Sequence, residues 1–215
     1  MDKNIQSFFD PKNIAIVGVS HSRKSFGNAV VETLHERGFQ LFPIHPDGGE
    51  IEGPDKCDPT RFYFAWDDNS LYLAAYCKES NMDSLSAMLT GQDAPIYGED
   101  CVGYFLQPDI KKQEVYQIYF SPLGSVFDQK ITPSEGGYMA GDPKWNGKYE
   151  VKTSKGTDYW SVEVRIPLAL LGAKIKPGLE WGLNFRRKQA RLATSANWQV
   201  PIDYDPSTFG QLVFQ

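Results

Sequence analysis

Histidine and cysteine, the usual carriers of acid–base and nucleophilic chemistry, are few in this sequence of 215 residues. The three histidines, His21, His35 and His45, all lie in its first 45 positions. The rest of the chain therefore lacks the imidazole that a Ser-His-Asp arrangement needs. Carboxylates are numerous, but no motif singles out a pair suited to glycoside hydrolysis. We therefore expect no catalytic residues and a protein that is not an enzyme.

The three cysteines, Cys57, Cys77 and Cys101, are an odd number at wide spacings. This pattern indicates neither a disulfide framework nor a zinc site, so free thiols are expected. The formal net charge of −5 gives the chain no general attraction for nucleic acid or for an anionic membrane surface.

The N-terminal ten residues are polar and lack the apolar stretch of a signal peptide. No segment approaches the roughly 20 apolar residues that cross a membrane. The chain as written is therefore expected in the cytoplasm.

The sequence divides into two dissimilar parts, and the strands and helices of these parts must position any functional site. Residues 1–56 indicate a βαβ unit, with an apolar run ending at Gly18, a helix from Phe26, and a second strand at residues 41–44. Gly38 is a suitable helix stop. After residue 49 the βα pattern ends, which places a boundary near residue 56 and a second domain at residues 57–215.

Residues 57–215 are typical of an antiparallel β-sandwich. Within 160–166, Trp160, Val162, Val164 and Ile166 alternate with polar residues, so they should share one buried face. Asp67-Asp-Asn69 indicates a hairpin turn. Strands are predicted at residues 61–65, 71–76, 101–107, 115–120, 125–130, 149–153, 159–166, 181–187 and 210–214.

This second piece resembles the family 9 carbohydrate-binding modules in the order and spacing of several segments. They are residues 64–73 (FAWDDNSLYL), 97–106 (YGEDCVGYFL), 115–124 (VYQIYFSPLG), 160–167 (WSVEVRIP), 181–186 (WGLNFR) and 209–214 (FGQLVF). The resemblance implies a non-catalytic sandwich that holds a sugar between two aromatic side chains. The physical logic is that aromatic plates bury the apolar C–H faces of the ring, while polar groups pair with its hydroxyls.

Transferred to this sequence, the two plates fall on Tyr97 and Tyr204, with Trp198 as the alternative to Tyr204. The two tyrosines are expected to face each other across a cleft one sugar ring wide. Gln117, Glu99 and Arg186 are the implied polar contacts, although Arg186 and Arg187 are also typical of solvated or ion-paired arginines. Gly103 replaces an acid of the family, and Gly103→Glu should strengthen binding if the backbone accepts a side chain.

The same resemblance implies structural calcium. Oxygen ligands are available in Asp67, Asp68, Glu99, Asp100, Asp203 and Asp205, but their spacing is not that of an EF-hand loop. We expect these acids to be solvated turn residues and assign no metal site.

The first piece resembles the start of a CoA-binding Rossmann-type domain, as found in acyl-CoA synthetases and succinyl-CoA ligases. The resemblance rests on residues 8–20, 26–30, 42–46 and 49–53. It implies that the nucleotide end of CoA is held by Gly18, Ser20, Ser22, Arg23, Lys24, His45 and Pro46, with phosphate at a helix N-terminus.

Most strands of such a domain are absent, so we expect a fusion with vestigial CoA binding. The alternative function is a CoA-binding cytoplasmic protein, or the remnant of an acyl-CoA synthetase or ligase subunit.

Overall fold

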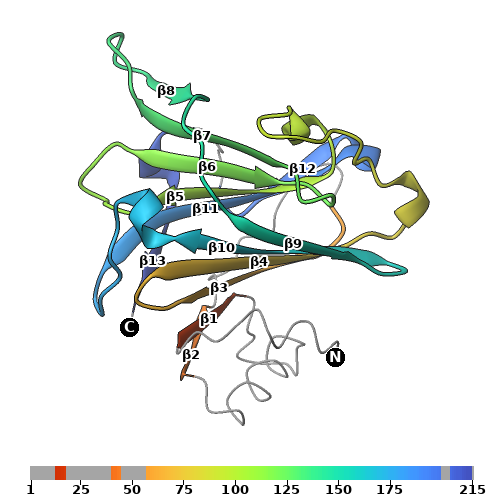
Figure 1. Cartoon of the computed structure of the whole chain (residues 1–215), viewed down its shortest axis with the longest axis horizontal. Coiled ribbons are helices and arrows are strands. Elements are labelled where there is room, and N and C mark those ends of the chain that lie inside the picture. Colours follow the sequence, from red (N-terminus) through yellow and green to blue (C-terminus); the bar gives the residue numbers. More distant parts are fainter. Residues whose placement is uncertain (1–12, 18–39, 45–56, 200–203, 215) are drawn as a thin grey trace.

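The computed structural model describes residues 13–17, 40–44, 57–199 and 204–214. These residues form two β-sheets that face each other, as Figure 1 shows. Within the described residues, no helix is long and apolar enough to cross a membrane.

Sheet A has the strand order β2-β1-β3-β4-β10-β9. Its strands are β1 (Asn13–Val17), β2 (Gln40–Ile44), β3 (Thr60–Trp66), β4 (Ser70–Lys78), β9 (Glu150–Lys155) and β10 (Tyr159–Pro167).

Sheet B has the order β12-β11-β5-β6-β7-β8, with β13 also paired to β11. Its strands are β5 (Cys101–Gln107), β6 (Val115–Phe120), β7 (Val126–Pro133), β8 (Met139–Asp142), β11 (Glu180–Gln189), β12 (Thr194–Asn197) and β13 (Gly210–Val213). Five short 3-10 helices lie in the described loops: η1 (Met82–Ser84), η2 (Ile96–Gly98), η3 (Leu168–Leu171), η4 (Ala190–Leu192) and η5 (Pro206–Thr208).

The predicted mainly-β fold is confirmed, and each of the nine predicted strands of residues 57–215 has a counterpart. Asp67 makes the hairpin turn because its Oδ1 accepts the N–H groups of Asn69 at 2.8 Å and Ser70 at 2.7 Å. In β10, burial alternates residue by residue, so Trp160 and its apolar partners face the other sheet. The four-residue strands β8 and β12 were not predicted.

The main core fills the space between the two sheets. Trp160, Trp181, Tyr104, Phe64 and Phe120 are its largest fully buried apolar side chains. Because side chains alternate along a strand, sheet B also has an opposite face. We call this the outer face; it carries a second apolar cluster and the residues Gly103, Phe105, Gln117, Tyr119, Phe127, Gln129 and Arg186.

The N-terminal strands extend sheet A. β1 pairs in parallel with β2 and antiparallel with β3, so both strands lie beyond the sandwich edge (Figure 1). The parallel pairing agrees with the expected strand directions of a βαβ unit. The expected helix lies outside the described residues, so the Rossmann-type fragment itself is not established.

Candidate functional site

The strand register assembles the outer face of sheet B in two rows. In one row, Gly103 of β5 lies between Arg186 of β11 and Tyr119 of β6, and Tyr119 pairs with Phe127 of β7. In the next row, Phe105 is followed by Gln117 and Gln129. Aromatic, amide and guanidinium side chains from four strands therefore meet on one surface.

Tyr97 stands at one side of this surface, in the short helix η2. Its ring packs edge-on against Phe127, with 4.9 Å between centroids, and lies 6.3 Å from the Tyr119 ring. The preceding residue, Ile96, is fully buried in the outer-face cluster and anchors the helix. Tyr97 is nevertheless 49% exposed, so much of its ring is available to a ligand.

Tyr204 meets the same surface and is 36% exposed. Its hydroxyl accepts a hydrogen bond of 3.0 Å from the amide of Gln129. The Gln129 amide also donates to Gln117, and Gln117 donates to the Tyr119 hydroxyl at 3.3 Å. This chain of hydrogen bonds connects Tyr204 to Tyr119. Gln117 is only 5% exposed, so it lies beneath the surface and positions the tyrosines.

Tyr119 occupies the space that Gly103 leaves open. A Cβ atom on Gly103 would lie 2.5 Å from Cε1 of the Tyr119 ring, closer than any real contact. The condition on the expected gain from Gly103→Glu is therefore not met, because the tyrosine ring fills the room that the new side chain needs. Burial raises the pKa of Tyr119 to about 12 although Arg186 lowers it, so the phenol stays protonated at neutral pH.

Arg186 completes this row on β11. Its Nη2 donates to Ser195 Oγ at 3.0 Å, and it lies close enough to Tyr119 to affect the phenol. The residue as a whole is half-buried. Arg186 therefore places a cation on the outer face close to Tyr119.

Sequence reasoning missed Tyr138, which is 68% exposed on the turn between β7 and β8. Tyr138 and Tyr204 line a hollow of about 390 Å³ together with Met139, Gln113 and Asp205. The Tyr138 ring lies over Gly136, where a Cβ atom would be 2.8 Å from it. The sequence signal was the Glu135-Gly-Gly-Tyr138 turn, whose glycines leave room for an aromatic plate.

Two of the residues predicted to contact the sugar, Trp198 and Glu99, do not lie on the outer face. Trp198 packs against the inter-sheet core, where its ring stacks on Phe185 with 5.0 Å between centroids. Glu99 is buried, and its Oε2 accepts the N–H groups of Met88 at 2.9 Å and Leu89 at 3.0 Å. The structure thus brings together Tyr97, Tyr204, Gln117 and Arg186, but neither Trp198 nor Glu99 faces them.

The acids implied for calcium are dispersed. Asp67 serves the β3–β4 turn, Asp100 accepts from the Ser86 N–H at 2.8 Å, and Asp205 accepts from the Ser207 N–H at 2.9 Å. Asp68 is exposed in the turn, and Asp203 lies outside the described residues. Over residues 57–199 and 204–214, no group of three or more His, Cys, Asp or Glu side chains could hold a metal ion. The described acids of this set therefore do not form a calcium cage.

The residues implied for CoA lie outside the described residues. They are Gly18, Ser20, Ser22, Arg23, Lys24, His45 and Pro46. Their assignment stays a prediction.

Comparison with solved structures supports the fold. A protein from Bacteroides uniformis, described as a candidate carbohydrate-binding protein, superposes with a TM-score of 0.60 at 18% identity, covering 96% of this chain and all of that one. A family 9 carbohydrate-binding module from Caldicellulosiruptor kristjanssonii, solved with cellotriose, gives a TM-score of 0.51 at 20% identity, with 76% and 78% of the two chains covered.

The N-terminal part has different relatives. Residues 12–63 match the model of the CoA binding domain family. The alpha subunit of an ADP-forming acetate–CoA ligase from Pyrococcus furiosus is 33% identical over 51 residues, which are 23% of this chain. This chain spans only 11% of the length of that subunit.

The larger part of the chain matches the family model described as carbohydrate family 9 binding domain-like, over residues 51–215. That range contains both sheets of the sandwich except β1 and β2, and it includes every residue of the outer face of sheet B. This protein belongs to the carbohydrate family 9 binding domain-like family.

Proposed function

We propose that this protein binds carbohydrate, without covalent chemistry, on the outer face of sheet B through Tyr97 and Tyr204. The observation that carries the proposal is that two half-exposed tyrosines stand beside one network of buried amides and phenols. The family membership and the cellotriose-bound neighbour support a neutral sugar as the ligand class.

The two plates would act through their apolar faces. A pyranose ring stacked on tyrosine removes C–H surface from water, and each aromatic contact contributes on the order of 1 kcal/mol. Gln129, which also donates to Gln117, holds the hydroxyl of Tyr204, so this tyrosine loses little rotamer freedom when a ligand arrives. Arg186 at the rim supplies N–H donors for sugar hydroxyls, which must stay hydrogen-bonded when buried.

Replacement of either plate should weaken sugar binding. We expect Tyr97→Ala and Tyr204→Ala each to raise the Kd for glucose or cellobiose roughly tenfold, which corresponds to about 1.4 kcal/mol. The free energy of unfolding should fall by less than about 1.5 kcal/mol, because each ring is exposed on one side. Isothermal titration with a panel of mono- and disaccharides, together with urea unfolding, measures both quantities.

The matched control is Tyr76→Ala. Tyr76 is a half-buried tyrosine of β4 that stacks on Tyr159, away from the outer face of sheet B. Its replacement should leave the Kd unchanged. Wild-type affinity in both plate variants, or equal losses in all three variants, would contradict the proposed site.

Tyr138 should act on longer ligands. Tyr138 lines the same hollow as Tyr204, Gln113 and Asp205. Its ring can therefore stack against a second sugar ring, while the Gln113 amide and the Asp205 carboxylate bind the hydroxyls of that sugar. Tyr138→Ala should raise the Kd for cellotriose about fivefold and leave that for glucose within twofold. Titration of both sugars against this variant tests the prediction; equal losses for the two ligands would rule out a second ring at Tyr138.

The CoA-binding alternative is favoured by the family match of residues 12–63. The residues that would hold CoA lie outside the described residues, so the alternative rests on sequence alone. Thermal unfolding measured with CoA and, separately, with the sugars distinguishes the two functions. The ligand that binds should raise the free energy of unfolding by about 2.7 kcal/mol when it is present at 100 times its Kd.

A further inference from the structure

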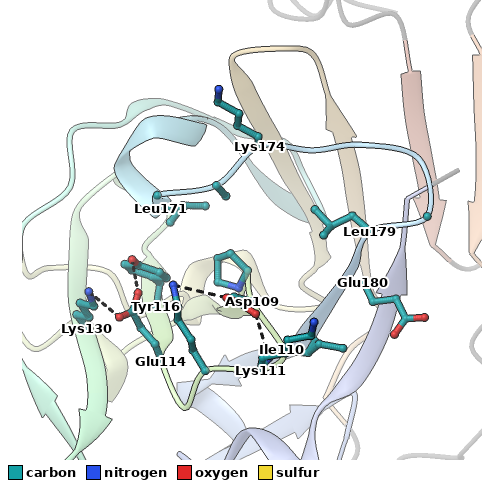
Figure 2. Close-up of a pocket in the computed structure, with 15 residues that line it drawn as sticks. Asp109, Ile110, Lys111, Glu114, Tyr116, Lys130, Leu171, Lys174, Leu179 and Glu180 are labelled. Carbon is teal, nitrogen blue, oxygen red and sulfur yellow. Dashed lines mark hydrogen bonds and ion pairs between the residues drawn. The ribbon is translucent and has the colours of Figure 1, made fainter.

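A second cavity, of about 680 Å³, opens at one end of the sandwich (Figure 2). It lies between residues 108–114, which connect β5 to β6, and residues 171–180, which lead from η3 into β11. We call this cavity the end cleft. Small-molecule sites in proteins have volumes of roughly 300–1,000 Å³, so the end cleft is large enough for a ligand.

The strand register positions the polar residues of the end cleft. Tyr116 of β6 pairs with Lys130 of β7, so both side chains lie on the inner side of sheet B. Glu114 precedes Tyr116 by two positions and contacts both of them. Gln113, the residue before Glu114, lines the hollow at Tyr204 instead. The end cleft is therefore separate from the outer face of sheet B.

Glu114, Tyr116 and Lys130 form a polar triad at one wall of the end cleft. Glu114 Oε1 accepts a hydrogen bond of 2.8 Å from the Tyr116 hydroxyl, and Glu114 Oε2 lies 2.9 Å from Lys130 Nζ. The Lys130 ammonium also lies 5.5 Å from the Tyr116 ring centroid. Burial raises the pKa of Glu114, but the hydrogen bonds from Lys130 and Tyr116 lower it more, so this carboxylate stays ionised at neutral pH. Both charged groups are thus held in place.

The polar triad keeps hydrogen-bonding capacity for a ligand. An ammonium has three N–H donors and a carboxylate has about four acceptor positions, so the contacts within the triad do not exhaust them. The side chains of Lys130 and Glu114 are 32% and 31% exposed, which leaves both within reach. As a pair they are neutral and present a donor beside an acceptor. Neighbouring hydroxyls of a sugar fit such a pair, because each hydroxyl both donates and accepts.

The opposite wall of the end cleft is apolar. Figure 2 shows Leu171 and Leu179 across the space from the polar triad, whereas Lys174 and Glu180 point away from it. Leu171 belongs to the main core, and the half-buried Leu179 packs against that core. The Phe214 N–H donates to the Leu179 carbonyl at 2.9 Å. Since the wall is fixed in this way, a ligand would need to order little of the chain.

We infer that the end cleft is a second binding site for a neutral sugar, independent of the outer face of sheet B. Two neighbouring hydroxyls of the ring would hydrogen-bond to Glu114 and Lys130, and the apolar C–H face would rest on the wall around Leu179. A ring with one polar edge and one apolar face matches a cleft with a polar triad on one wall and leucines on the other. The choice of a sugar among such ligands rests on the proposed function.

The test is an NMR titration with glucose, followed by the backbone amide shifts of residues 109–114 and 172–180. It is carried out on Tyr204→Ala, in which the proposed outer-face site is weakened. Glucose should still shift the amides of the end cleft. Adding Lys130→Met, which keeps the apolar stem and removes the N–H donors, should raise the Kd read from these amides about fivefold.

Two further measurements accompany this titration. The matched control is Lys78→Met, because Lys78 is also ion-paired, 4.0 Å from Asp158, but lies on β4 of sheet A. It should leave the Kd at the end cleft unchanged. Sorbitol, which carries hydroxyls like those of glucose but has no ring, should bind the end cleft of the protein without the lysine substitutions roughly fivefold more weakly than glucose, because it cannot place a C–H face on the apolar wall.

The outcomes separate this inference from the proposed function. Glucose that leaves the amides of the end cleft unshifted overturns the second site, as does a Lys130→Met variant that binds as tightly as its parent. Equal binding of sorbitol, or tighter binding of glucuronate than of glucose, overturns a neutral ring as the ligand. If glucose does not shift the amides of Tyr97 and Tyr119 in the wild type, the proposed outer-face site fails, and shifts at the end cleft still support the second site.

Discussion

Replacing Arg187 by methionine should lower the free energy of unfolding by about 3–5 kcal/mol at pH 7. The side chain is 0% exposed, and its Nη2 lies 3.2 Å from Asp100 Oδ1 and 3.7 Å from Glu79 Oε2. Its guanidinium also lies 4.9 Å from the Trp160 ring centroid. Without the cation, Asp100 would be buried without an ion partner beside Glu79, which keeps Arg191, and an uncompensated buried carboxylate is the costly part of breaking a buried ion pair.

The pH dependence of this loss gives a specific signature. Burial raises the pKa of Asp100, whereas Arg187 lowers it. In the variant the lowering by Arg187 is lost while burial and the neighbouring Glu79 still raise the pKa, so protonation of Asp100 becomes easier and relieves the repulsion. The stability difference between wild type and Arg187→Met should therefore be largest at pH 7–8 and shrink as the pH falls toward 4.

Urea unfolding across this pH range is the measurement, with Arg186→Met as the control. Arg186 is the half-buried neighbour whose Nη2 bonds Ser195, so its replacement should cost only about 1 kcal/mol. A loss below about 1 kcal/mol for Arg187→Met, or one that grows on acidification, would contradict the role assigned to this cluster.

Gly103→Ala should cost about 2 kcal/mol and impair sugar binding as well. The new Cβ atom would approach Cε1 of Tyr119 to 2.5 Å. That ring is confined by Phe105, Phe127 and Tyr97, so it can yield only by displacing them. Movement of Tyr119 would also disturb its hydrogen bond from Gln117 and hence the network that holds Tyr204.

Gly98→Ala is the matched control, because a Cβ atom there has no neighbour within 4 Å. It should leave stability within about 0.5 kcal/mol. Unfolding measurements and sugar titration on both variants test the prediction. If Gly103→Ala matched the wild type in stability and bound sugar more tightly, the Tyr119 ring would have to swing aside freely, contrary to the packing described above.

The sequence by itself determined the local structure at several places within residues 57–199. Alternation at Trp160, Val162, Val164 and Ile166 is a property of one strand and its two faces, so it needs no knowledge of partners. Asp67 likewise makes its turn with backbone groups two and three residues away. Tyr97 and Tyr204 were nominated by resemblance, and their contacts with Phe127 and Gln129 place them at the outer face.

Only the tertiary structure decided which polar residues are buried and which space is filled. Arg187 and Arg186 are adjacent in the chain, yet strand alternation places one between the sheets and the other on the outer face. The space beside Gly103 that a larger side chain would need is filled by Tyr119, which pairs with Gly103 on the next strand. Tyr138 lines the same hollow as Tyr204, which lies 66 positions later in the sequence (204 − 138). These outcomes depend on pairings between distant segments, and side-chain packing between such segments leaves no periodic signal in the sequence.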